Sequence, residues 1–225
     1  SKLMKRVLSI MMIAILAIGL LAGCAKVPEE KLQAVRDKHA QLEDAYTRLG
    51  EVIDELDSYQ MGAVAPSLRD DYEQLGEDLA SNKEIIDTQL EKMKEEEVDE
   101  VILQLDTDLA DVNSYMPALD SMMETLSYIM GISESMMEKS ARLEELAMQY
   151  STDGVTPSDE VQQAYEDYNT MMTDYAANLN GIESEMDEDD PNSMIAAFDS
   201  LKSMVDDMAA ATDNLIALME ADLGV

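Results

Sequence analysis

The chain is poor in the residues from which most active sites are built. Its 225 residues include one cysteine, one histidine, one phenylalanine and no tryptophan. A bis-histidine zinc site and the paired Glu-x-x-His motif of di-iron bundles both need a second histidine. A glycine-rich phosphate loop and the Gly-x-Ser-x-Gly nucleophile elbow are absent from the sequence. These absences argue against an enzyme, and nothing in the sequence indicates a resident cofactor.

Basic residues are scarce as well. The chain has 49 Asp and Glu against 15 Lys and Arg, a formal net charge of −34. Such a surface repels the phosphates of nucleic acids and anionic lipid headgroups, so binding to DNA or RNA is excluded as a function class. The acidity suits a cationic partner, diffuse binding of divalent cations, or a surface that is merely solvated in a saline habitat. The sequence leaves these three open.

The single cysteine stands at an informative place. Cys24 closes the tetrapeptide Leu21-Ala22-Gly23-Cys24, at the end of an apolar run that begins directly after the basic residues Lys2, Lys5 and Arg6. This arrangement resembles the lipobox signal of bacterial lipoproteins. The uncharged run Val7–Ala22 is sixteen residues long, whereas a helix needs about 20 apolar residues to cross a bilayer. A signal peptide is therefore favoured over the alternative, an uncleaved transmembrane anchor.

The resemblance implies how the chain is processed. A diacylglyceryl group would be attached to the Cys24 sulfur, and cleavage before Cys24 would remove residues 1–23 as a signal peptide. Residues 24–27 would then form a lipidated tether and 28–225 a single helical domain. The cleaved chain 24–225 would contain 49 acidic and 12 basic residues. The protein would lie on the outer face of the plasma membrane in a Gram-positive host. In a Gram-negative host Ala25, which is not the aspartate of an inner-membrane retention signal, implies the outer membrane.

The pattern of apolar residues predicts an all-α fold. They recur at alternating spacings of three and four, as in a helix that packs on other helices. The five prolines of the chain stand at positions where a helix can begin. We expect an elongated, antiparallel, coiled-coil-like bundle of about five long helices. Three of them cover residues 28–60, 66–116 and 117–150, and two more begin at Pro157 and Pro191. Thr156 and Asp190 are the expected cap residues before the last two.

The segment 66–116 admits two interpretations. Its apolar stripe is interrupted at the charged stretch 94–97 and restarts at Val98, so the segment is either one helix with a shift of phase or two helices joined by a turn. One helix is favoured because the stretch contains no Gly, Pro or Asn. The acids of this region are expected on solvated helix faces: the triplet Glu95–Glu97, and Asp106, Asp108 and Asp111.

The helix expected over 117–150 has an unusually wide apolar face, made of two adjacent lines with seven-residue spacing. One line includes Met122, Ile129 and Met136, and the other Met123, Met130 and Met137. A helix flanked on several sides by neighbours needs such a face, so we expect this helix to be the most buried. A short echo also links Tyr46-x-x-Leu49-Gly50-Glu51 with Tyr72-x-x-Leu75-Gly76-Glu77 and marks either a duplication or a coincidence.

Methionines offer one candidate site. Thioethers bind Cu(I), and the pairs Met122-Met123 and Met136-Met137 could present them, as could Met171-Met172. Because these positions follow the helical seams, core packing is the favoured interpretation. A pliable, methionine-rich groove for a partner helix is a third hypothesis that uses the same residues.

Carboxylates and the lone histidine offer weaker candidates. The acidic run containing Asp187, Asp189 and Asp190 could gather Ca²⁺, but it lacks the alternating spacing and the glycine of an EF-hand loop. Plain solvation or diffuse attraction of cations is favoured there. His39 lies on the apolar stripe of the first helix, so we expect a packed side chain.

One further resemblance concerns function. The residues Pro28-Glu29-Glu30-Lys31, leading into a long helix, are similar to the start of cell-wall-binding lipoproteins of Gram-positive bacteria; the similarity covers the first dozen residues after cleavage, and those proteins are less acidic. We expect a lipid-anchored, extracytoplasmic helical bundle with a binding or structural role toward an envelope protein. The alternative is a metal-handling lipoprotein that binds Cu(I) through Met or Ca²⁺ through acidic clusters. Neither expectation includes catalytic residues.

Overall fold

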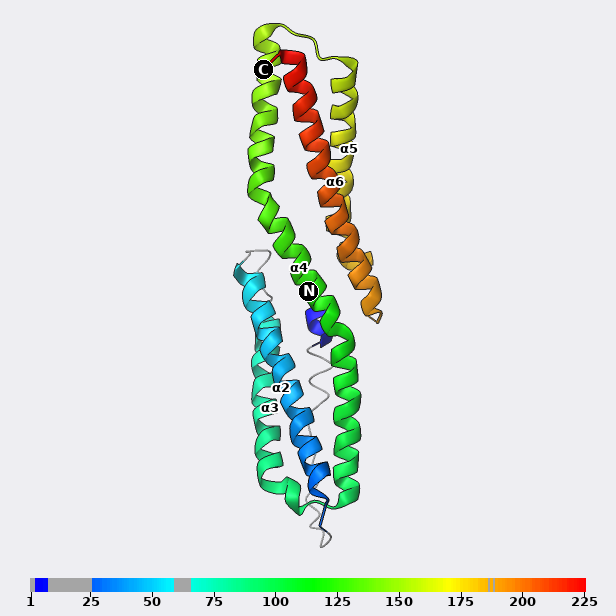
Figure 1. Cartoon of the computed structure of the whole chain (residues 1–225). Helices are drawn as coiled ribbons and strands as arrows, with labels where there is room; N and C mark the ends of the chain where they lie inside the picture. The colour runs from blue at the N-terminus through cyan, green and yellow to red at the C-terminus, as the bar shows by residue number, and fades with distance from the viewer. Residues whose placement is uncertain (1–2, 8–25, 59–65, 186, 188) are drawn as a thin grey trace. The chain divides into compact units, whose positions relative to one another are not determined.

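The computed structural model describes residues 3–7, 26–58, 66–185, 187 and 189–225 (Figure 1). Within these residues the chain is helical and contains no strand. The predicted all-α helical bundle is confirmed, with five long helices and one short 3₁₀ turn. In chain order these are α2 (Glu29–Ser58), α3 (Pro66–Gln89), η1 (Leu90–Lys92), α4 (Glu95–Asp153), α5 (Asp159–Glu185) and α6 (Pro191–Leu223).

The helices form two compact units, each considered by itself below. Unit 1 comprises residues Ser1–Leu119 and unit 2 residues Asp120–Val225, so the boundary falls inside α4. Pro117 also lies inside α4. The expectation that a new helix begins at this proline is therefore wrong. The helical pattern on both sides of Pro117 outweighs the one backbone hydrogen bond that a proline removes.

The expected single helix over 66–116 is also wrong. Helix α3 ends at Gln89, η1 follows, and Met93 is extended with φ −78° and ψ 157° before α4 begins at Glu95. The acidic triplet Glu95–Glu97 forms the first turn of α4, where carboxylates favour the positive end of the helix dipole. The Glu97 side chain accepts a hydrogen bond from the Lys94 N–H at 3.3 Å, one half of a capping box. This capping starts a helix without Gly, Pro or Asn.

The starts of the last two helices follow capping rules. Asp190 caps α6 as predicted: its side chain accepts from the Asn192 N–H at 3.0 Å, and Pro191 occupies the first turn. Helix α5 begins two residues later than Thr156 suggested. Ser158 is the cap instead of Thr156, because the cap residue directly precedes the first helical residue, Asp159. Its hydroxyl accepts a hydrogen bond from the Val161 N–H at 3.3 Å.

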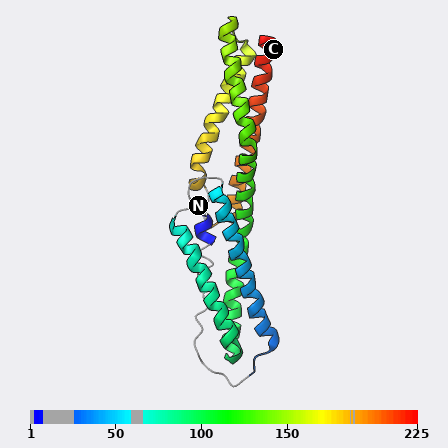
Figure 2. The same cartoon turned by 90° about the vertical axis from the view of Figure 1, so that its left-hand side faces the viewer.

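In unit 1 the sequence echo corresponds to a reciprocal packing of α2 against α3 (Figure 2). The rings of Tyr46 and Tyr72 stack with centroids 4.2 Å apart. A methyl group at Gly50 would overlap the Tyr72 hydroxyl, and one at Gly76 would overlap the Tyr46 hydroxyl. Each tyrosine therefore lies over the glycine of the other motif. The Tyr72 hydroxyl donates to the Tyr46 carbonyl at 3.2 Å. Burial, together with the side chain of Tyr46, raises the pKa of Tyr72.

Ion pairs set the direction of α2 relative to the first part of α4. Lys31 contacts Glu95 at 2.9 Å and Asp99 at 2.7 Å, and Lys38 pairs with Asp106. Residues further along α2 pair with residues further along α4, so these two helices run parallel. Helix α3, which comes between them in the chain, runs antiparallel to both. Residues 3–7 also belong to this unit: Leu3, Met4 and Val7 are buried, and the Arg6 guanidinium lies 6.0 Å from the centre of the Tyr115 ring.

Among the described residues of unit 1, three polar side chains are buried: His39, Asn82 and Asp108. His39 is buried, as its stripe predicted, with Nδ1 3.0 Å from Glu43; burial lowers the pKa of His39 despite that carboxylate. The expectation of a solvated Asp108 is wrong. Asp108 lies on the buried line of α4, three residues beyond Leu105, and its Oδ2 has no hydrogen-bond partner within the described part of the chain. Burial, with the nearby charge of Asp111, raises the pKa of Asp108 to about 6.

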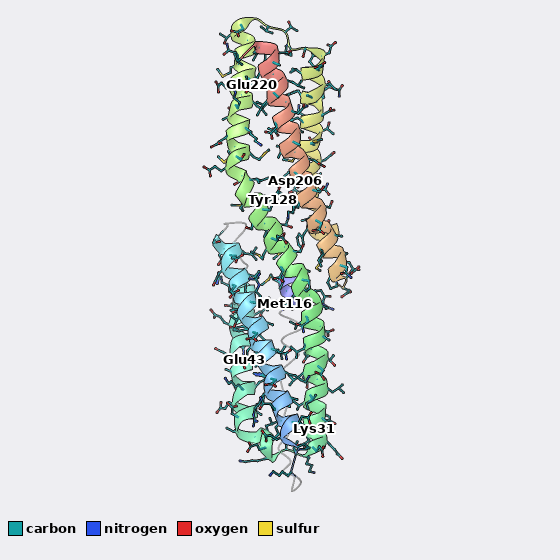
Figure 3. The ribbon with its side chains drawn as sticks, viewed as in Figure 1. Lys31, Glu43, Met116, Tyr128, Asp206 and Glu220 are labelled. Carbon is teal, nitrogen blue, oxygen red and sulfur yellow. The ribbon has the colours of Figure 1, made fainter. Side chains whose placement is uncertain are left out.

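In unit 2, α5 and α6 lie side by side and antiparallel. Polar contacts join α6 to α4: Lys202 to Glu124, Asp206 to Tyr128, and Glu220 to Arg142, each pair separated by 78 residues in the chain. The constant separation means that α4 and α6 run parallel. Figure 3 shows Tyr128 and Asp206 meeting between these two helices.

A small apolar core closes the end of unit 2 near the α4–α5 turn. It is formed by Leu146, Tyr150, Val161, Leu215 and Met219. Asp222 accepts two hydrogen bonds of 2.9 Å, from the Tyr150 hydroxyl and from the Ser158 N–H. The Ser158 N–H and the Tyr150 hydroxyl hold the pKa of Asp222 below its usual range, while burial raises the pKa of Tyr150 to about 12. The carboxylate thus ties the start of α5 to the end of α6.

Candidate functional site

A groove of about 820 Å³ lies in unit 2 between α4, α5 and α6. Helix α4 forms one long wall, α5 supplies four tyrosine or methionine side chains, and α6 contributes three apolar residues. The side chains that characterise it are Ile129, Ile132, Met136, Met137, Leu143 and Glu144 of α4, Tyr165, Tyr168, Met172 and Tyr175 of α5, and Val205, Met208 and Met219 of α6.

The groove follows from the width of the apolar face of α4. In this unit, the polar contacts described above hold one side of the helix against α6. The adjacent line of seven-residue spacing is exposed: Met130 by 36% and Met137 by 73%. On α5, Tyr165, Met172 and Leu179 form a second exposed line with the same spacing. Two apolar lines therefore face solvent where a bundle normally buries them.

The expectation that 117–150 is the most buried helix is wrong for its C-terminal half. Residues 126–145 contain no buried side chain, and burial resumes only at Leu146. The apolar stripe of α5 shows the same outcome, because only Val161 on it is buried. Its other members are Tyr165, Tyr168, Met172, Tyr175, Leu179 and Ile182. Periodicity reports that a face is apolar, whereas burial requires a neighbour on that face.

The candidate methionines are distributed between core and groove. Met122 and Met123 are buried, as core packing predicted, but Met137 is exposed and lines the groove with Met136. Fourteen residues of helix, about 21 Å, separate the two pairs, so they cannot share one ion. The sulfurs that share the groove with Met136 and Met137 belong instead to Met172, Met208 and Met219.

The candidate calcium ligands are exposed and take part in the turn before α6. Asp187 accepts from the Asp189 N–H at 2.9 Å, and Asp190 is the α6 cap. Among the residues described by the structure, no group of three or more His, Cys, Asp or Glu is arranged to hold a metal ion.

Neither the tyrosines of the groove nor Glu144 were among the candidate site residues expected from the sequence. The available signal was the seven-residue spacing of Tyr165, Met172 and Leu179, which matches that of Met130 and Met137. Burial raises the pKa of the groove residue Tyr175 above its ordinary value. The groove can therefore offer aromatic faces, thioethers and a carboxylate, which suits binding.

The charge around the groove is strongly one-sided. Residues 120–225 contain 24 acidic and 3 basic residues. All three bases are paired on the α4–α6 side: Lys139 with Asp213 at 2.9 Å, Arg142 with Glu145 at 3.0 Å and Glu220 at 3.2 Å, and Lys202 with Glu124 at 3.3 Å. The Glu220 contact helps to raise the pKa of Arg142. Unit 2 consequently presents an excess of negative charge to any ligand of the groove.

The lipobox residues Leu21, Ala22, Gly23 and Cys24 lie outside the described residues. None of the described helices combines the length and the apolar character needed to span a bilayer. The chain matches no protein-family model, and comparisons with curated proteins and with solved structures found no significant similarity.

Proposed function

We propose that the protein is a lipid-anchored, extracytoplasmic helical lipoprotein that binds a protein partner in the cell envelope. The tetrapeptide ending at Cys24 supports the anchor, and the net charge supports a body that stands away from anionic headgroups. The observation that carries the binding role is the open groove of unit 2, where Met137, Tyr165 and Met172 remain exposed. Exposed apolar surfaces of this kind mark interaction sites in soluble domains.

Processing has a structural consequence for unit 1. Cleavage before Cys24 removes residues 3–7, whose Leu3, Met4 and Val7 are buried in this unit, and takes Arg6 away from Tyr115. The precursor and the mature protein would therefore differ in the surroundings of Tyr115. Among the described residues, the groove of unit 2 is lined only by side chains of α4, α5 and α6.

Metabolic labelling tests the anchor. Cells that express the whole chain are fed an alkyne analogue of palmitate, and the purified protein is examined by fluorescence and mass spectrometry. We expect labelled protein whose first residue is acylated Cys24, and no label on Cys24→Ala. Met137→Lys, which changes only the groove, serves as the matched control and should be labelled like the unmodified chain. An unmodified thiol with residues 1–23 still attached would reject the anchor.

Retention of Cu(I) is the second candidate function, favoured by the five methionines that line one groove. A ligand that binds only the folded protein raises its melting temperature. Under this alternative, micromolar Cu(I) raises the melting temperature of the chain, and Met136→Leu with Met172→Leu removes the increase. Leucine keeps the size of the side chain and removes the sulfur, so unchanged stabilisation in the double variant would exclude thioether ligands.

A further inference from the structure

We propose that the groove of unit 2 receives a basic amphipathic helix of about 18 residues from the partner protein, lying along α4. The proposal rests on the binding role described above and specifies the chemistry of the partner. Length, lining and charge each support it independently.

The length of the groove fits a helix better than a compact ligand. The lining residues of α4 run from Ile129 to Ala147 and recur every three or four residues, forming one continuous stripe. Eighteen residues of α-helix extend about 27 Å. Helices α4, α5 and α6 supply three members of a bundle around this stripe, and a fourth helix would cover both exposed lines.

The lining suits an apolar helix face of variable sequence. Methionine is unbranched and adapts to different partners, and methionine-rich surfaces are used where helices dock into grooves. Tyr165 and Tyr168 add rigid aromatic surface from α5. Met137 and Tyr165 are both more than half exposed in the free protein, so a partner helix can cover large apolar side chains without displacing packed ones.

Charge selects a basic partner. With 24 acids and three already paired bases in residues 120–225, unit 2 carries a formal net charge of −21. A second copy of the chain would bring the same charge and be repelled. Lys and Arg on the rim of a docked helix can lay their methylene stems along the methionines and reach carboxylates such as Glu144. They can also lie over the ring of Tyr165.

Peptide binding to the whole chain tests the proposal. The probe is a fluorescein-labelled peptide of about 18 Leu and Lys residues, with Leu on one helical face. Two controls are a peptide of the same composition without an apolar face and one in which Glu replaces Lys. Anisotropy should show saturable binding of the probe, with both controls at least about tenfold weaker. Equal binding of either control would overturn the proposal, because pattern or charge would then not matter.

Two matched pairs of variants locate the binding surface. Met137 and Met148 are exposed by 73% and 71% on the same helix, but only Met137 lines the groove. Met172 and Met171 are exposed by 38% and 37% on α5, and only Met172 lines it. Met137→Lys and Met172→Lys should weaken probe binding by at least about tenfold, while Met148→Lys and Met171→Lys should change it less than about twofold.

Each result decides between occupants. Equal loss in all four variants would show binding to the general charge of the protein and reject the groove. Circular dichroism checks that the variants stay helical, as substitutions at exposed positions should. Sedimentation showing a dimer that Met137→Lys dissolves would overturn the proposal in favour of a second copy. Probe binding without acylation at Cys24 would reject only the anchor, whereas acylation without probe binding would reject only the groove.

Discussion

Two stretches of α4 share one apolar line but differ in burial. Leu109, Met116, Met123, Met130 and Met137 follow each other at seven-residue intervals. Leu109 and Met123 are buried, whereas Met137 is 73% exposed; Figure 3 labels Met116 on this helix. The residues stay apolar and the spacing stays the same along the line, but the number of neighbouring side chains that cover them does not. An apolar line therefore marks where a neighbour can pack, and the structure decides whether that neighbour belongs to the same chain.

The two units also differ in charge. Residues 1–119 contain 25 acidic and 12 basic residues, and residues 120–225 contain 24 and 3. Unit 1 uses its bases to join α2 to α3 and α4, as in the pairs Arg69–Asp57 and Lys38–Asp106. Unit 2 has one base for every eight acids and uses all three between α4 and α6. Unit 2 combines an open apolar surface with uncompensated charge, which together favour binding of a cationic, amphipathic partner.

The largest expected effect compares two methionines of the line. Met123→Ala removes a side chain that is 4% exposed and should lower the free energy of unfolding by about 2–5 kcal/mol. Met137→Ala should change it by less than about 0.5 kcal/mol, because the side chain is already in water. Both substitutions have nearly the same helix propensity, so thermal melts compare burial directly. Similar losses at both positions would mean that Met137 is covered in solution.

The next effect concerns Asp108, whose raised pKa makes unit 1 sensitive to pH. Between its ordinary pKa of 3.8 and its folded pKa of about 6, the folded state holds a proton that the unfolded chain has released. The free energy of unfolding should therefore fall as pH rises through this window and stay low above it. Asp108→Asn should remove this loss, worth at most about 3 kcal/mol near pH 7 and nearly nothing near pH 4.

Melts of the two proteins between pH 4 and 7 measure this difference. Asp111→Asn is the control, because the Asp111 charge is the smaller cause of the shift and burial the larger. It should keep most of the pH dependence. If Asp111→Asn removed the dependence completely, repulsion between the two carboxylates would be the cause rather than burial.

Two helical glycines should respond in opposite directions. Gly50→Ala gains about 1 kcal/mol of helix propensity but forces a methyl group onto the Tyr72 hydroxyl, at a cost of about 1–3 kcal/mol. Gly131→Ala meets nothing within 4 Å and should stabilise unit 2 by about 1 kcal/mol. In Gly50→Ala with Tyr72→Phe the overlapping oxygen is gone, so the double variant should be more stable than the sum of the single effects. Strict additivity would rule out the close contact.

Local signals explain how much of the fold was predictable. Spacing and capping residues gave the helices, and Asp190 with Pro191 gave the start of α6 to the residue. The break before Glu95 was missed because it depends on an acidic first turn and the Glu97 side chain, and the expectation relied on Gly, Pro and Asn. The expectation of a helix start at Pro117 failed because it relied on the proline alone. Its local penalty is smaller than the packing of a continuous α4.

The candidate site was only partly predictable, since it depends on what is missing around an apolar face. The wide face of α4 was visible in sequence, and a methionine-rich groove was one hypothesis drawn from it. Periodicity could not show that α5 and α6 leave Met137 and Tyr165 uncovered, because that depends on how three helices are arranged. Periodicity also led to the expectation of a solvated Asp108. The buried face of α4 includes Val101, Leu105 and Asp108, whereas the apolar pattern favoured Leu109 at this turn of the helix.

The smallest expected effect compares two lysines, Lys38 of unit 1 and Lys139 of unit 2. Both side chains are 26% exposed, and each pairs with one aspartate, Asp106 and Asp213 respectively. Replacing Lys38 by Met should lower the free energy of unfolding by less than about 0.5 kcal/mol at low salt, as for other exposed pairs. Lys139→Met should cost up to about 1 kcal/mol, since it leaves two bases against 24 acids in its unit.

In about 1 M NaCl the Debye length falls to about 3 Å, so melts of both variants should approach the unmodified chain. A loss at Lys139 that persists in high salt would come from packing of its methylene stem, and equal losses at low salt would show that the local pair matters more than the charge of the unit.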